Sequence, residues 1–186
     1  EREVAGWFLL DLSPSVAFGS QTLEKRTVAA DFVAVLARIL TAHGNRVGAL
    51  LYGDRVDTVI PARSGRRQVL HLLHRMETRP DVKSANATNL ADLLRMAWRV
   101  APRRSLVFVV SDFISTPGWA KPLAQLARRH DVVAVRLYDP LEMELPDLGL
   151  LVVQDAETGE QLFVDTHDRG FRKRFVAAAK EREAEL

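Results

Sequence analysis

Five side chains with hydroxyl or carboxylate oxygens fall in loops that follow predicted strands or precede a predicted helix. They are Asp11, Ser13, Ser15, Thr88 and Asp112. Asp11, Ser13 and Ser15 alternate along a loop that leaves a strand, where their side chains can turn towards one point. All five are hard oxygen donors, and no His or Cys accompanies them. The set therefore predicts a site for Mg²⁺, with Mn²⁺ as the alternative, rather than for Zn²⁺ or copper.

Short apolar runs and amphipathic helical patterns alternate along most of the chain, and they define the elements that position these donors. Strands are predicted at residues 7–10, 47–52, 106–110 and 132–138, and helices at residues 27–43, 66–78, 90–100 and 119–130. Residues 57–62 are expected to pair back on the second strand. Residues 150–153 and 162–164 predict a hairpin around a turn at residues 157–160, and a last helix begins at Asp168.

This alternation, with strands that are apolar on both faces, predicts an α/β fold. The expected architecture is three-layered and Rossmann-like, with a mostly parallel central sheet, helices on both faces and an antiparallel hairpin. Ligands of such sheets bind outside the carboxyl ends of the strands. The loops that carry Asp11, Thr88 and Asp112 are therefore expected to converge at one edge of the sheet.

Length and composition narrow the class of protein. The chain has 186 residues, 47% of them apolar, which predicts a single domain over residues 1–186. A net charge of +2 argues against binding to nucleic acid, and the absence of Cys excludes disulfides and thiolate ligands. No apolar run approaches the ~18 residues that a membrane-spanning helix needs. We expect a cytoplasmic protein.

The chain opens at Glu1, directly before its first predicted strand, so we expect it to be the C-terminal part of a longer chain. Membrane association through a preceding segment stays open.

Enzymatic interpretations of the same oxygen donors lack their characteristic partners. An aspartyl phosphatase with Asp11 as nucleophile needs a second Asp at the position that Ser13 occupies. The sequence has no Gly-x-Ser-x-Gly elbow, no Gly-x-Gly-x-x-Gly after the first strand and no P-loop lysine motif. We therefore predict that the chain is not an enzyme.

The complete donor pattern resembles the metal-ion-dependent adhesion site of von Willebrand factor type A domains. Such sites have Asp-x-Ser-x-Ser after a buried first strand, a Thr in a later loop and an Asp after a later strand. The wider sequence resembles the bacterial domain-of-unknown-function family 58, on the basis of residues 11–20, 46–48, 52–54 and 155–159. Two departures stand beside the site: Ala87 replaces a frequent Gly before Thr88, and Pro14 stiffens the first loop.

The resemblance implies a von Willebrand A-like fold whose bound Mg²⁺ grips a protein partner. Ser13 and Ser15 would bind the ion directly, and Asp11, Asp112 and Thr88 directly or through water. A carboxylate of the partner would then replace one water. The family's genes commonly lie beside those of MoxR-type AAA+ ATPases, so the implied partner is such an ATPase or its client. Two alternatives stay open, a metal-dependent phosphoester hydrolase and a structural metal-binding module.

Overall fold

The computed structural model describes residues 4–17, 24–80, 87–154 and 160–184, and a central parallel sheet organises most of them. Its strands are β1 (Ala5–Asp11), β2 (Arg46–Tyr52), β3 (Val56–Arg63), β4 (Leu106–Ser111) and β5 (Asp131–Arg136). Their order is β3-β2-β1-β4-β5, and only β3 runs antiparallel to its neighbour in this part of the chain. The predicted α/β architecture is confirmed.

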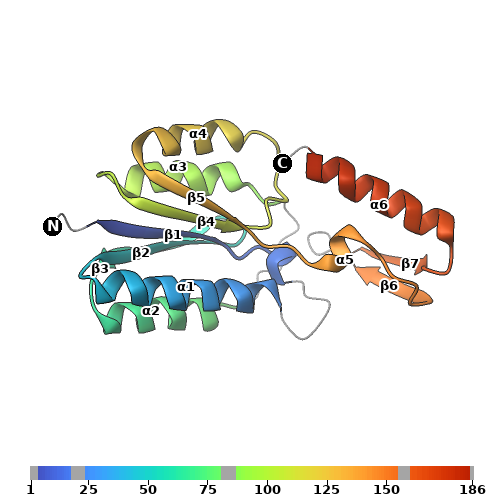
Figure 1. Ribbon diagram of the computed structural model, residues 1–186, viewed down its shortest axis with the longest axis horizontal. Helices are drawn as coiled ribbons and strands as arrows, with labels where there is room; N and C mark the ends of the chain where they lie inside the picture. The colour runs from blue at the N-terminus through green and yellow to red at the C-terminus, as the bar shows by residue number, and fades with distance from the viewer. Residues whose placement is uncertain (1–3, 18–23, 81–86, 155–159, 185–186) are drawn as a thin grey trace.

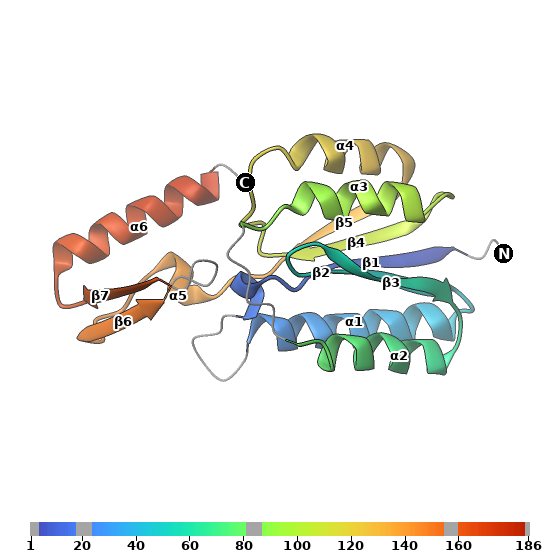
Figure 2. The ribbon, with the colours of Figure 1, turned by 180° about the vertical axis from the view of Figure 1, so that it is seen from behind.

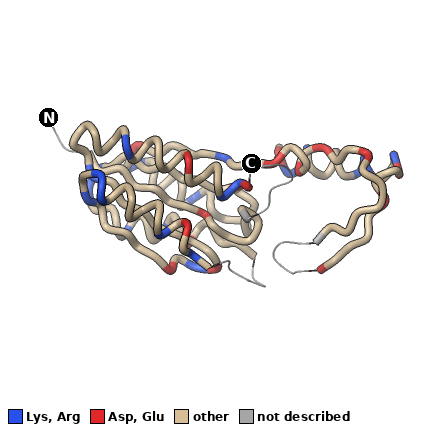
Figure 3. Tube along the Cα trace, turned by 90° about the horizontal axis from the view of Figure 1, so that it is seen from below, with Lys and Arg blue, Asp and Glu red and all other residues tan. Residues whose placement is uncertain are grey.

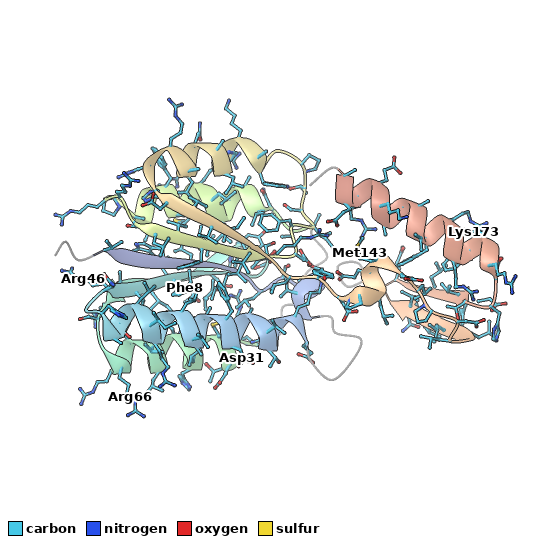
Figure 4. The ribbon with its side chains drawn as sticks, viewed as in Figure 1. Phe8, Asp31, Arg46, Arg66, Met143 and Lys173 are labelled. Atoms are coloured by element: carbon cyan, nitrogen blue, oxygen red, sulfur yellow. The ribbon has the colours of Figure 1, made fainter. Side chains whose placement is uncertain are left out.

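Two pairs of helices cover the two faces of the sheet (Figure 1). One face packs against α1 (Lys25–Ala42) and α2 (Arg66–Glu77), and the other against α3 (Leu90–Val100) and α4 (Ala120–Arg129). Alternate residues of β1 divide between the two cores: Phe8 lies on the α1 side (Figure 4) and Leu9 on the α3 side. Both are fully buried, which explains the unbroken apolar run that marked this strand in the sequence.

The pairing of β1 with β2 and β4 brings the site loops to one edge. Asp11 is in register with Tyr52 of β2, and Leu10 with Val110 of β4. Because these strands are parallel, their carboxyl ends lie side by side. Gly48 permits the close packing of β2, since a Cβ there would lie 2.8 Å from the carbonyl oxygen of Ile60.

A smaller unit follows β5 and extends beyond the carboxyl ends of the strands (Figures 1 and 2). It consists of α5 (Pro140–Met143), β6 (Leu150–Gln154), β7 (Gln161–Asp165) and α6 (Arg169–Ala184). The strands β6 and β7 form the predicted hairpin, as a separate antiparallel sheet. Most of the turn predicted at residues 157–160 lies outside the described residues. Figure 3 shows this C-terminal unit beside the larger layered part, with acidic and basic residues interspersed in both.

Two helices near the site differ from the prediction, one in its first residue and one in its existence. Helix α1 begins at Lys25 rather than at residue 27, which places Lys25 in its first turn. Helix α5 was not expected at all, because Asp139 and Pro140 were interpreted only as the end of a strand. No helix in the described part of the chain is long and apolar enough to cross a membrane.

Candidate metal centre

Asp11 ends β1 and is 1% exposed, so its carboxylate depends on protein donors. One oxygen, Oδ1, accepts the backbone N–H of Ser13 at 3.0 Å. The other, Oδ2, accepts the hydroxyl of Ser111 at 2.6 Å. Ser111 is the last residue of β4, so this hydrogen bond joins the ends of two neighbouring strands.

Asp112 directly follows β4 and is also 1% exposed. Its Oδ1 accepts the backbone N–H of Ile114 at 2.9 Å, and its Oδ2 lies 3.3 Å from the ammonium of Lys25. The intervening Phe113 has a φ of 61°, an unusual conformation for a residue with a side chain. Its N–H donates to the Ser111 hydroxyl at 2.9 Å, which holds the strand end in this shape.

The two carboxylates lie near enough to repel each other. Burial, and then the negative charge of Asp112, raise the pKa of Asp11 from 3.8 to about 6. The hydrogen bonds from Ser111 and Ser13 act in the opposite direction, because they stabilise the ionised carboxylate. Two buried carboxylates in this arrangement favour a nearby cation.

Ser13 and Ser15 lie on a turn that follows Asp11. Their hydroxyl oxygens are 3.1 Å apart, and Ser13 is 1% exposed. The turn is the 3-10 helix η1 (Pro14–Ala17), in which the N–H of Val16 donates to the carbonyl of Ser13 at 3.0 Å. Pro14 begins this helix, where its fixed φ is compatible with the turn and its missing N–H is tolerated. The departure at Pro14 therefore leaves both hydroxyls together.

Thr88 is 2% exposed, and its backbone is bonded to the loop that follows Asp112. Its carbonyl accepts the N–H of Thr116 at 2.8 Å and the hydroxyl of Ser115 at 3.0 Å. The Ser115 hydroxyl also accepts the N–H of Leu90, at the start of α3, at 2.9 Å. These bonds join the loop of Thr88 to the loop of Asp112. Ala87 is exposed, so a side chain is tolerated at that departure from the family pattern.

Two charged residues that the sequence analysis did not identify stand beside these donors. Lys25 is 4% exposed, and its ammonium pairs with Asp112 and, at 2.5 Å, with Glu142 of α5. Nothing in the sequence marks Lys25, because lysine at the start of a helix is ordinarily solvated. Glu142 did carry a signal: Asp139, Pro140 and Glu142 have the spacing of a helix capping box, which the structure contains.

The donor set fits Mg²⁺ by its chemistry. Hydrogen bonds join Asp11, Ser13 and Ser15, and Asp112 follows Ser111, whose hydroxyl binds Asp11. The backbone of Thr88 is bonded to the loop that follows Asp112. No group of three or more His, Cys, Asp or Glu side chains suited to a metal is found in the described residues, so a metal here depends on the hydroxyls. Mg²⁺ accepts such ligands and keeps several waters.

The strand order and the antiparallel β3 agree with the three-layered α/β fold predicted from the sequence. Comparison of the sequence gives the family: the chain belongs to the family described as "Protein of unknown function DUF58", which matches residues 1–185. That assignment agrees with the resemblance seen in the sequence.

Curated relatives come from mycobacteria. "Uncharacterized protein Rv1480" of Mycobacterium tuberculosis is 36% identical over 159 residues, which cover 86% of this chain and 50% of that protein. "Uncharacterized protein MAV169" of Mycobacterium avium is 37% identical over 129 residues, 69% of this chain and 76% of that protein. The chain thus spans about half the length of the first of these relatives.

Solved structures of low sequence identity share the fold. An aerotolerance-related membrane protein from Bacteroides fragilis has a TM-score of 0.66 at 15% identity, covering 95% of this chain and 88% of that one. The conserved hypothetical protein BatB from Bacteroides thetaiotaomicron has a TM-score of 0.61 at 17% identity, covering 95% and 87%. At these identities the likeness concerns the fold alone.

Replacing Ser111 with Ala removes the hydroxyl that Asp11 accepts, and we expect a loss of about 1.5–3 kcal/mol in the free energy of unfolding. The loss is large because a buried carboxylate is left short of one donor. Urea denaturation at neutral pH, with a chelator present, measures it. Ser105→Ala is the matched control, since Ser105 is 2% exposed and donates to the neutral carbonyl of Arg103. An equal or greater loss for Ser105→Ala contradicts the role given to Ser111.

Proposed function

We propose that the chain is a Mg²⁺-dependent protein-interaction domain and not an enzyme. The observation that carries this proposal is the pair of buried carboxylates, Asp11 and Asp112, beside a turn on which the hydroxyls of buried Ser13 and half-buried Ser15 lie 3.1 Å apart. Burying two carboxylates close together destabilises a protein unless cations or hydrogen-bond donors compensate their charges, and a bound divalent ion would supply such compensation. The membership of the family and the von Willebrand A-like fold support a role in protein interaction.

Each residue of the chain has a distinct part in this proposal. Ser13 and Ser15 present their hydroxyl oxygens from one turn and would bind the ion directly. Asp11 and Asp112 supply negative charge, directly or through water, and their backbone hydrogen bonds fix their orientation. Thr88 would complete the set from the α3 side. Mg²⁺, when bound, supplies a position that a carboxylate of a partner can occupy in place of water.

For the partner we propose a MoxR-type AAA+ ATPase or its client. This part rests on the resemblance to the family, whose genes commonly lie beside those of such ATPases. In that arrangement the ATPase performs the nucleotide chemistry, and this chain acts as an adaptor. The proposed site by itself implies only that the partner carries an acidic group, which would bind at the metal.

Mg²⁺ is expected to raise the melting temperature of the wild-type chain by about 5–10 °C at a hundredfold excess over Kd. A ligand that binds only the folded state contributes about 2.7 kcal/mol at that excess, and a chain of this size gains about 2–4 °C per kcal/mol. Asp11→Asn should abolish the shift, because it removes a ligand charge and keeps the side-chain volume. Asp31→Asn, at an exposed position of α1 (Figure 4), is the control. Equal shifts in the wild type and Asp11→Asn would remove this site from consideration.

Thr88→Ala should weaken binding of a MoxR-type ATPase more than it weakens binding of Mg²⁺. A neutral ligand can be replaced by water at modest cost, while the loop that faces the partner changes. Asp112→Asn should weaken both, because losing a charge beside a divalent ion costs about 1–4 kcal/mol at effective dielectric constants of ~80 to ~20. Calorimetry with Mg²⁺ and then with the ATPase as titrant measures the two affinities.

Three results would count against the adaptor. Phosphoester turnover by the purified chain in Mg²⁺ would favour the hydrolase. A Mg²⁺-induced rise in melting temperature without Mg²⁺-dependent partner binding would favour the structural module. Unchanged ATPase affinity in Thr88→Ala would contradict the assigned role of that residue.

A further inference from the structure

Lys25 is a buried charge that metal binding, as proposed above, does not require. Its side chain is 4% exposed, and its ammonium lies between two carboxylates, 3.3 Å from Asp112 Oδ2 and 2.5 Å from Glu142 Oε1. Asp112 belongs to the candidate metal centre, whereas Glu142 comes from α5 of the C-terminal unit. The Lys25 ammonium therefore connects Asp112 of the candidate metal centre to Glu142 of α5, which lies 30 residues after Asp112 in the sequence.

Glu142 is held in this position by its own helix. Its second oxygen, Oε2, accepts the backbone N–H of Asp139 at 3.2 Å, while the Asp139 carboxylate accepts the N–H of Leu141 at 2.8 Å. This capping box orients the side chain, so that Oε1 is the oxygen that meets Lys25. Figure 4 labels the adjacent Met143 and shows that α5 lies at the carboxyl end of the sheet.

The balance of charge among the ionisable side chains at this edge limits how many carboxylates the site can hold. Asp11, Asp112 and Glu142 are three carboxylates, and Lys25 is one ammonium, so the four ionised groups carry a formal excess of two negative charges. One divalent cation balances them. A further carboxylate from a partner would restore an excess of negative charge, unless one of the chain's own carboxylates leaves as the partner's enters. Glu142 is the one that can leave, because it is half-buried and belongs to a short helix, whereas Asp11 and Asp112 are fixed at strand ends.

We propose that Glu142 is an internal stand-in for the partner's carboxylate, and that an acidic segment of the partner displaces it and pairs with Lys25. Lys25 is then a second anion-binding group beside the metal, and it makes the site selective for acidic chains. The proposal rests on the Mg²⁺-dependent function above and names the chemistry of what that site binds. Because α5 joins β5 to the hairpin, the exchange also frees the start of the C-terminal unit.

The test uses a synthetic peptide of alternating Asp and Gly with blocked ends, and its Asn counterpart, as calorimetric titrants in saturating Mg²⁺. Glu142→Gln should bind the acidic peptide about tenfold more tightly than the wild type, if Glu142 occupies the position about nine-tenths of the time. Glu144→Gln is the matched control: it removes an exposed carboxylate that follows the same helix, and its affinity should equal that of the wild type. The Asn peptide should bind none of them.

The role of Lys25 as an anion-binding group is tested in the Glu142→Gln variant. Adding Lys25→Met to Glu142→Gln should remove the gain, because the anion-binding ammonium is lost. Hydrogen exchange should show faster exchange of the α5 amides in the wild type when the acidic peptide binds.

Mg²⁺ titrations of the same samples separate the two levels of the argument. If Mg²⁺ binds but Glu142→Gln and the wild type have equal affinity for the peptide, or neither binds it, the assignment of Glu142 is wrong while the metal site stands. If Mg²⁺ does not bind, both proposals are wrong. If the double variant keeps the full gain, Lys25 is not an anion-binding group.

Discussion

The burial of two carboxylates at the ends of adjacent strands is the constraint on which this edge of the molecule depends. Asp11 and Asp112 are each 1% exposed, and the charge of Asp112 contributes to the raised pKa of Asp11. Both oxygens of Asp11 accept a hydrogen bond, one from the N–H of Ser13 and the other from the hydroxyl of Ser111. The two oxygens of Asp112 accept from the N–H of Ile114 and from the ammonium of Lys25. The loops adopt the shapes that these donors require, including the positive φ of Phe113.

The parallel sheet brings the two carboxylates and their hydrogen-bond donors to the same edge. Because β1 and β4 are paired neighbours, the hydroxyl of Ser111 at the end of β4 can donate to Asp11 at the end of β1, and both Asp11 and Asp112 are 1% exposed. The loop before α3 is attached to the same edge through Ser115. Under the proposal, a cation at this edge would be bound by oxygens from separate parts of the chain, so its binding would couple loops that the backbone alone leaves independent. This coupling is the physical basis of the proposed interaction domain.

Sequence reasoning predicted the fold well because the signals were local. The apolar run at residues 106–110 and the helical spacing in residues 90–100 each depend on neighbours in sequence. The candidate donors could be proposed for the same reason, since each follows a strand or precedes a helix; their role as metal ligands stays a prediction. Lys25 and Glu142 were missed because their pairing joins α1 to α5 across 117 residues, and no local pattern encodes it. The position of the C-terminal unit relative to the central sheet could not be predicted from local sequence patterns either, although the hairpin within it was predicted.

The most direct test of the central claim is a crystal structure of the chain grown with Mn²⁺, with anomalous diffraction recorded at the manganese edge. The account predicts one strong anomalous peak within bonding distance, about 2.0–2.3 Å, of the Ser13 and Ser15 hydroxyls. It also predicts that Asp11 and Asp112 reach this ion directly or through one water. A peak at any other group of residues, or no peak between β1 and β4 at saturating Mn²⁺, would contradict it.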